Sequence, residues 1–342
     1  MVKIRNKKAA NEVSKSLDGY LKENDRAMKL PLDYNDLLHF SNKISVYNKY
    51  GEDTLWYSVN YDQSTREMVH DGLKHIYALL KTDGNMDVIK HLEVERIDFC
   101  SFGNSQPFRI RIINKFNDNY DHYYVKKTDA NRIYGLELED LLSPNRFDYL
   151  VYNKTLIEEH VAGLPGDQFI EKYVENPNVE INKVRIAKEF IKFNERCSIR
   201  LLGDMRAYNY VVDITPDFED TQYRVRAIDF DQECYEGHYK VYLPQFFKDN
   251  NAIVNLVISN LNPNTQDQYR EEERTLLFKR YRAEDEKLKL LLNVMEADVL
   301  SPPQNVTKLA KELNAYHNTN IFRSCHSMGS ILKTNLKLCL GL

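Results

Sequence analysis

The chain has 342 residues, of which 42% are hydrophobic and 29% charged, and its formal net charge is −4. This length and composition supply enough apolar residues for one large folded domain or two ordinary ones, which excludes disorder over most of the chain. The slightly negative charge argues against nucleic acid as the main partner.

The cysteine pattern and the hydropathy bear on where in the cell the protein is expected. The five cysteines are widely spaced and contain no C-x-x-C pair, so a zinc site or a disulfide framework is not expected and a reducing compartment is favoured. The basic N-terminal stretch has no apolar run behind it, and no apolar run is long enough to cross a bilayer. We therefore expect a cytoplasmic protein with no membrane span.

Residues 1–92 are expected to form a mostly helical N-terminal extension. The clearest helix is predicted to begin at Ser64, which forms a capping-box pattern with Glu67. Apolar residues then recur on one helical face from Val69 to Leu80.

The period of the hydrophobic pattern changes to two in residues 93–158. The stretches "VERIDFCSF", "FRIRIINKF" and "HYYVKK" are separated by the turn sequences "GNSQP" and "NDNYD", which predicts three antiparallel strands. A helix with Tyr134, Leu138 and Leu141 on one face should follow and end at Ser143-Pro144. Two further strands are expected in "FDYLVYN" and "TLIEEHV".

Residues 159–342 are expected to be mainly helical. A helix near Ile181 to Glu195 precedes a strand in "YNYVVDI" and a second strand in "YRVRAIDF". Charged amphipathic segments follow, and Pro302-Pro303 should break the last of them.

Two polar motifs lie just outside the last two predicted strands. Asp204 and Asn209 have the spacing D-x-x-x-x-N, and Asp229 ends the strand of "RAIDFDQE". Phosphoryl transfer needs a carboxylate that accepts the proton of the attacking hydroxyl, and oxygen ligands that hold Mg²⁺ against the phosphates. We assign Asp204 as the base and Asn209 and Asp229 as metal ligands.

A cation and its partner precede these motifs. Lys126 or Lys127 ends the third strand, where a lysine can position the phosphates of ATP. On the next helix, Glu137 or Glu139 can pair with that lysine. Helical geometry places Glu137 nearer the apolar face, so Glu137 is favoured.

The order of these motifs resembles the protein-kinase-like superfamily, and most closely its aminoglycoside and choline phosphotransferase branch. The stretch "LGDMRAYN" is similar to the family's catalytic H-G-D-x-x-x-x-N, and Asp229-Phe230-Asp231 is similar to its metal motif. The resemblance covers residues 94–237. It implies an α+β, two-lobed kinase-like fold with a small antiparallel-sheet N-lobe (93–158) and a mainly helical C-lobe (159–342).

The resemblance also implies roles for further residues. It favours Lys126 as the phosphate-positioning lysine, because Val125-Lys126 matches the family's apolar-then-lysine ending. The turn with Gly103, Asn104 and Ser105 occupies the place of the phosphate-covering loop. The backbone of Glu159 and Val161 should face adenine in the hinge, and Arg206 should neutralise the transferred phosphoryl group, although a salt bridge explains it equally well. ATP, Mg²⁺ and an unidentified hydroxyl-bearing acceptor are the expected ligands.

Two departures from the family pattern leave other functions open. Leu202 stands where the family has a histidine, and the phosphate loop has one glycine, Gly103. A catalytically weak pseudokinase that binds nucleotide or docks a protein partner is therefore the alternative. Nucleotidyl transfer to a protein is a third possibility on the same fold.

Overall fold

The structure is a computed structural model that describes residues 8–82, 84–218 and 221–342. Its contacts divide the chain into two compact units. The sheet unit comprises residues up to Ala130 together with Phe147–His160, and the helical unit comprises Asn131–Arg146 and Val161–Leu342. The expected α+β class is confirmed. Within the described residues, no helix is both long enough and apolar enough to cross a membrane.

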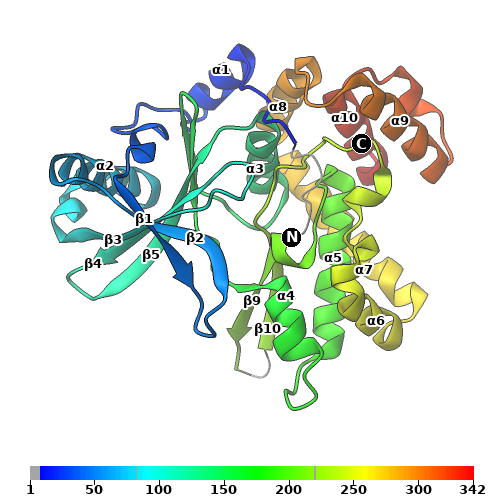
Figure 1. The fold of residues 1–342 in the computed structure, drawn as a ribbon. Coiled ribbons are helices and arrows are strands. Elements are labelled where there is room, and N and C mark those ends of the chain that lie inside the picture. The colour runs from blue at the N-terminus through cyan, green and yellow to red at the C-terminus, as the bar shows by residue number, and fades with distance from the viewer. Residues whose placement is uncertain (1–7, 83, 219–220) are drawn as a thin grey trace. The chain divides into compact units, whose positions relative to one another are not determined.

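The sheet unit is built on a seven-stranded antiparallel sheet, drawn from blue to green in Figure 1. Its strand order is β1-β2-β3-β4-β5-β7-β6. The strands span Asn42–Tyr47 (β1), Asp53–Asn60 (β2), Leu92–Phe99 (β3), Phe108–Asn114 (β4), Asn119–Lys127 (β5), Tyr149–Tyr152 (β6) and Thr155–Glu159 (β7). The five strands predicted between residues 93 and 158 are confirmed. The alternation of β3, β4 and β5 matches the pleat of a half-buried strand, whereas β6 and β7 are buried over nearly their whole length.

The helix α2 (Gln63–Lys81) packs against one face of this sheet. Its apolar stripe, which includes Leu73 and Ile76, joins Ile110 and Val125 of the sheet in one buried cluster. The helix was expected, but its N-cap is Asp62 rather than Ser64, so the predicted capping box is wrong. The short helix α1 (Lys15–Glu23) lies closer to the N-terminus.

The prediction that residues 1–92 are mostly helical is wrong for the hairpin of β1 and β2, which extends the sheet at one edge. Gly51 has a φ of 81° in the turn of that hairpin, a conformation that glycine adopts without strain. β1 is largely exposed, so its sequence lacks the clear apolar alternation of an inner strand. Residues 1–7 of the same prediction lie outside the described residues.

The helical unit contains a three-stranded antiparallel sheet and several helices. The sheet has the order β10-β9-β8, with bounds Leu164–Pro165 (β8), Tyr210–Pro216 (β9) and Thr221–Ala227 (β10). The helices are α3 (Ala130–Leu142), α4 (Gly166–Phe169), α5 (Lys183–Arg200), α6 (Asn251–Asn260), α7 (Pro263–Ala283), α8 (Asp285–Ala297), α9 (Pro303–Tyr316) and α10 (Met328–Leu340). α5 is central, since it packs against α6, α7, α10 and β10. The predicted helix near 181–195, the two strands after it and the break at Pro302-Pro303 are confirmed.

Candidate functional site

The loop that carries Asp204 follows directly from the C-terminus of α5. Leu201 caps that helix with a φ of 57°, and Asp204 itself has a φ of 58°. The loop is fixed by its backbone, because the Asp204 amide donates to the carbonyl of Val241 at 3.0 Å and the Gly203 amide donates to Gln232 at 3.2 Å. A side-chain-bearing residue with positive φ is uncommon and is held only where the surroundings determine it.

The carboxylate of Asp204 is half-buried and bonded to Arg206. The Nε of Arg206 donates to Asp204 Oδ1 at 3.0 Å, and its Nη1 donates to Asp249 Oδ2 at 3.2 Å. Burial raises the pKa of Asp204, and the charge and hydrogen bond of Arg206 oppose that rise. Arg206 therefore makes the salt bridge that the sequence left as an open alternative.

Asn209 connects the Asp204 loop to the segment that carries Asp229. Its side-chain Nδ2 donates to the carbonyl of Asp204 at 2.8 Å, and its own carbonyl accepts from the amide of Ile228 at 3.0 Å. Since Nδ2 is bonded in this way, the orientation of the amide group is fixed. Asn209 Oδ1 makes no hydrogen bond with the described part of the chain.

The carboxylates of Asp229 and Asp231 share an arginine from α3. Nη1 of Arg132 lies 2.8 Å from Asp229 Oδ1 and 2.8 Å from Asp231 Oδ1, and Nη2 donates to the carbonyl of Ile228 at 3.1 Å. The Asp231 amide also donates to Asp229 Oδ1 at 3.1 Å. No local pattern pointed to Arg132, because it lies almost a hundred residues from its partners along the chain.

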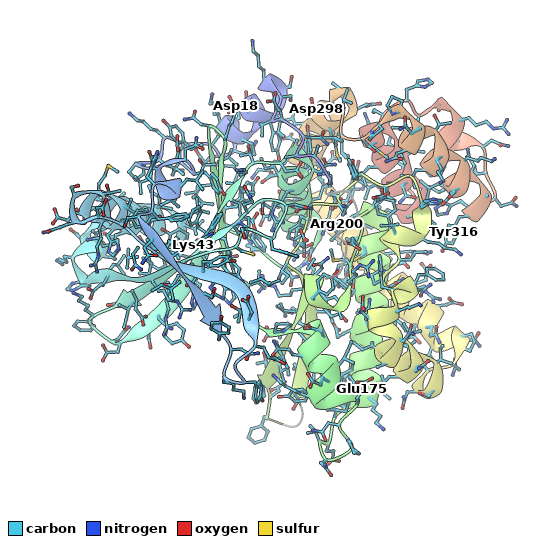
Figure 2. All side chains as sticks on the ribbon, viewed as in Figure 1. Asp18, Lys43, Glu175, Arg200, Asp298 and Tyr316 are labelled. Atoms are coloured by element: carbon cyan, nitrogen blue, oxygen red, sulfur yellow. The ribbon has the colours of Figure 1, made fainter. Side chains whose placement is uncertain are left out.

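A buried charged cluster braces the same elements. Arg200, at the end of α5, pairs with Glu139 of α3 and lies 3.6 Å from Glu233, which follows the Asp229 motif. α3 comes close here because Gly135 has no side chain, and a Cβ there would lie 2.8 Å from Phe230 Cβ. Figure 2 labels Arg200 within the helical unit, where its side chain is 1% exposed. The brace connects the elements that hold Asp204 and Asp229.

The two carboxyl groups of this brace titrate differently. Burial acts to raise the pKa of Glu139, but Arg200 and the hydrogen bonds to the carboxylate outweigh burial, so this pKa is lowered. Burial raises the pKa of Glu233 to about 8, and neither of its carboxyl oxygens has a hydrogen-bond partner. One arginine thus lies beside two carboxyl groups, and burial favours the protonated form of Glu233.

Asn209 and Asp229 lie on adjoining segments, and each carries a side-chain oxygen of the kind that Mg²⁺ binds. Mg²⁺ is commonly held by one or two protein oxygens together with substrate phosphates. The fixed orientation of the Asn209 amide and the Asp229 carboxylate fit that donor set. In the described part of the chain, no group of three or more His, Cys, Asp or Glu side chains is placed to hold a metal by itself.

The candidate lysine lies in the sheet unit. Lys126 Nζ is 2.7 Å from Glu158 Oε2 of the neighbouring strand β7, and both residues are buried. Lys127 instead donates to Gln106 Oε1 at 2.7 Å. Glu137 is a buried residue of the helical unit, so its pairing with Lys126 stays a prediction. Sequence reasoning missed Glu158 as a partner. The pairing of β5 with β7 places Leu156 opposite Lys126 and Glu158 opposite Tyr124, so Glu158 reaches Lys126 diagonally across the two strands.

The turn between β3 and β4 contains Gly103, Asn104 and Ser105. The Gln106 amide donates to the Gly103 carbonyl at 3.1 Å, and Tyr34 Oη donates to the Gln106 carbonyl at 2.8 Å. The amides of Asn104 and Ser105 make no hydrogen bond with the described residues. The turn is therefore held from one side by a tyrosine of the N-terminal extension, and two of its amides remain available.

The two hinge residues belong to different units. The amide of Glu159 donates to the carbonyl of Asp148 at 3.0 Å, and its side chain pairs with Lys81. Val161 is a buried residue of the helical unit. Their contact with adenine stays a prediction.

No protein-family model matches this sequence, and no curated protein matches it significantly.

Proposed function

We propose that the chain is an ATP- and Mg²⁺-dependent phosphotransferase with a hydroxyl acceptor, built as a two-lobed kinase-like enzyme. The observation that carries the proposal is the convergence of two separate motifs in the helical unit. Asn209 bonds to the backbone of Asp204 on one side and to the residue before Asp229 on the other. A base, an amide oxygen and a carboxylate therefore lie on adjoining segments.

Each residue has a distinct task in this proposal. Asp204 orients the acceptor hydroxyl and accepts its proton, and the Arg206 bond keeps the carboxylate ionised against the effect of burial. Asn209 and Asp229 would hold Mg²⁺, which supplies charge neutralisation on the phosphates. Lys126 positions the α- and β-phosphates with Glu137 as its proposed partner, and the amides of Asn104 and Ser105 cover them.

Catalysis in such a site comes from alignment and charge neutralisation rather than from a covalent intermediate. The brace of Arg200, Glu139 and Glu233 suits this requirement, because it fixes the segments that carry Asp204 and Asp229. It replaces the support that the family histidine gives, since Leu202 is a buried apolar residue here.

The first test is Mg²⁺-dependent ATP consumption by the purified chain. Asp204→Asn should lower the rate by about 10²–10⁴-fold, because a positioned base contributes about that much. The unfolding midpoint should remain close to that of the unmodified chain. Asp213→Asn, which changes a carboxylate further along β9, is the matched control and should leave the rate unchanged. Undiminished turnover in Asp204→Asn would remove this residue from its role.

One observation favours a second candidate, a pseudokinase. Arg132 already places a positive charge between Asp229 and Asp231, where the proposed metal would need their oxygens. Nucleotide binding without turnover is the expected behaviour of that candidate. If Arg132→Gln raises Mg²⁺ affinity yet no ATP is consumed, the pseudokinase is the better description.

A further inference from the structure

The end of the chain is basic, in contrast to the rest. Residues 299–342 contain five Lys and Arg residues and one carboxylate, Glu312, which gives a local charge of +4. The whole chain has a charge of −4, so the preceding residues carry −8. A charge asymmetry of this size indicates an affinity for anions at this end of the molecule.

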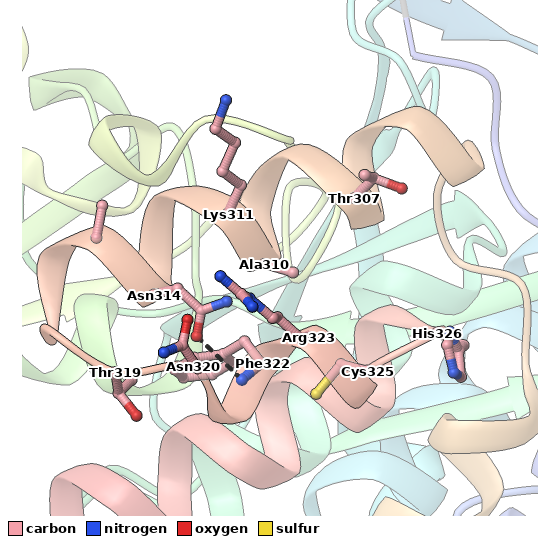
Figure 3. Close-up of a pocket in the computed structure, with 11 residues that line it drawn as sticks. Thr307, Ala310, Lys311, Asn314, Thr319, Asn320, Phe322, Arg323, Cys325 and His326 are labelled. Atoms are coloured by element: carbon pink, nitrogen blue, oxygen red, sulfur yellow. Dashed lines mark hydrogen bonds between the residues drawn. The ribbon is translucent and has the colours of Figure 1, made fainter.

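A pocket of about 490 Å³ lies in this basic region, between α9 and the segment that follows it. One wall is a face of α9 with Thr307, Lys311 and Asn314, and the other runs from Thr319 to His326, including the short helix η8 (Ile321–Ser324) (Figure 3). The buried ring of Phe322 contributes apolar surface to the pocket. The volume is suitable for a small molecule.

The lining of this pocket offers hydrogen-bond donors and no carboxylate. The side chains of Lys311 and Arg323 make no ion pair or hydrogen bond with the described residues. Asn314 Oδ1 accepts from the amide of Phe322 at 3.1 Å, the bond drawn in Figure 3. The amide nitrogen of Asn314 therefore remains as a donor with a fixed orientation.

Two other cations of the same segment, Lys308 and Lys333, are already paired. Lys333 contacts Glu296 at 2.9 Å, and Lys308 contacts His238 on the 238–242 segment. Lys311 and Arg323 differ from them, because they line a concavity and have no such partner. Figure 3 shows the guanidinium of Arg323 beside Asn314, whereas the ammonium of Lys311 points away from both. No carboxylate lines the pocket, so a bound anion would supply the counter-charge of Arg323.

We propose that this pocket binds a small oxyanion-bearing molecule, with a phosphate or carboxylate group held by Arg323 and Asn314 and attracted by the charge of Lys311 on the same wall. The guanidinium matches the planar, bidentate geometry of either oxyanion, and the ammonium adds a second charge. The lining side chains are largely exposed, so the expected affinity is modest, with a Kd on the order of 1 mM or tighter. This site does not depend on the proposed phosphotransferase activity.

The test is calorimetric titration of the full chain with inorganic pyrophosphate and, separately, with citrate, at constant ionic strength and without Mg²⁺. The double variant Lys311→Gln/Arg323→Gln should bind at least about tenfold more weakly for each lost charge-assisted contact. The double variant Lys287→Gln/Lys337→Gln makes the same change in net charge at exposed positions outside the pocket and should bind as the unmodified chain does.

Each outcome of the titration either supports or overturns the proposed anion site. Binding of one probe that is weakened in the pocket variant alone supports the site, and the preferred probe separates phosphate from carboxylate. Equal weakening in both double variants indicates general surface attraction and overturns the proposal. An absence of heat with both probes overturns it as well. The melting temperature of each variant in chloride buffer shows whether the fold is retained.

Discussion

The interiors of the two units differ in how many charged side chains they bury. The core of the sheet unit is one apolar cluster, in which α2 covers a sheet face made of residues such as Ile110 and Val125. Both units bury charged side chains, but the helical unit buries more of them, and several lie along α5, where Arg196 pairs with Glu273 at 2.9 Å and Arg200 pairs with Glu139. Apolar contacts are non-directional, whereas buried ion pairs have defined partners and geometry.

The difference explains which unit holds its loops in place. Apolar packing fixes the sheet and α2, but it tolerates small adjustments of shape. The bonds of Arg200 and Arg132 connect α3 and α5 to the segment 228–233 through named atoms. The buried ion pairs therefore position the candidate site. The stability of this unit should fall whenever one partner of such a pair is removed.

The largest expected effect comes from removing one partner of the buried cluster. Arg200→Met leaves the Glu139 carboxylate uncompensated, and the free energy of unfolding should fall by about 3–5 kcal/mol. Urea denaturation measures this loss. Arg224→Met, on an exposed position of β10, should change stability by no more than about 0.5 kcal/mol. Equal stability of the two variants would contradict the contrast between the units.

The next largest effect is the pH dependence of stability that Glu233 causes. Its pKa rises from 4.5 to about 8 on folding, so between these values the folded state retains a proton that the unfolded state releases. The contribution is complete below pH 4.5 and is lost as pH rises through about 8. It reduces stability by at most about 1.4 kcal/mol per pH unit in that window.

Glu233→Gln should remove this contribution, so the fall in stability between pH 5 and pH 8 becomes shallower than in the unmodified chain. Urea denaturation at several pH values gives both curves. If stability falls with pH equally in the variant and the unmodified chain, the pKa of Glu233 is not raised by folding.

A conservative change in the apolar core should matter less. Ile110→Val removes one methylene from the buried cluster of the sheet unit and should lower the free energy of unfolding by about 1 kcal/mol. This loss of stability should be the same at every pH, since the substitution alters no charge. If Ile110→Val lost as much stability as Arg200→Met, the sheet unit would be no more tolerant of substitution than the helical unit, which would contradict the contrast.

The smallest effect is on the pH dependence of the proposed reaction. Arg206 lowers the pKa of Asp204, so Arg206→Gln should move the acidic limb of kcat/KM to higher pH, with a rate loss below about tenfold at the optimum. Asp249 raises the same pKa, so Asp249→Asn should move the limb the opposite way. Shifts in one direction for both variants would contradict Asp204 as the titrating base.

Much of the sheet unit was predictable, and its exceptions have local causes. Strands β3 to β5 follow from the alternation of residues that face a buried and a polar side, and β6 and β7 follow from short apolar runs. The hairpin of β1 and β2 was missed, because an exposed edge strand has a weak pattern. Lys126 was placed correctly at the end of β5, yet its partner Glu158 follows only from the pairing of β5 with β7.

The sequence by itself determined the α+β class, most strands and helices, and the polar residues Asp204, Asn209 and Asp229 that end or begin them, because periodicity and residue chemistry are local. Only the tertiary structure decided that Asn209 joins the other two motifs, that Arg132 lies between two carboxylates and that Glu233 lies beside an arginine already paired with Glu139. These facts depend on contacts between residues far apart in the chain, and no local pattern encodes such contacts.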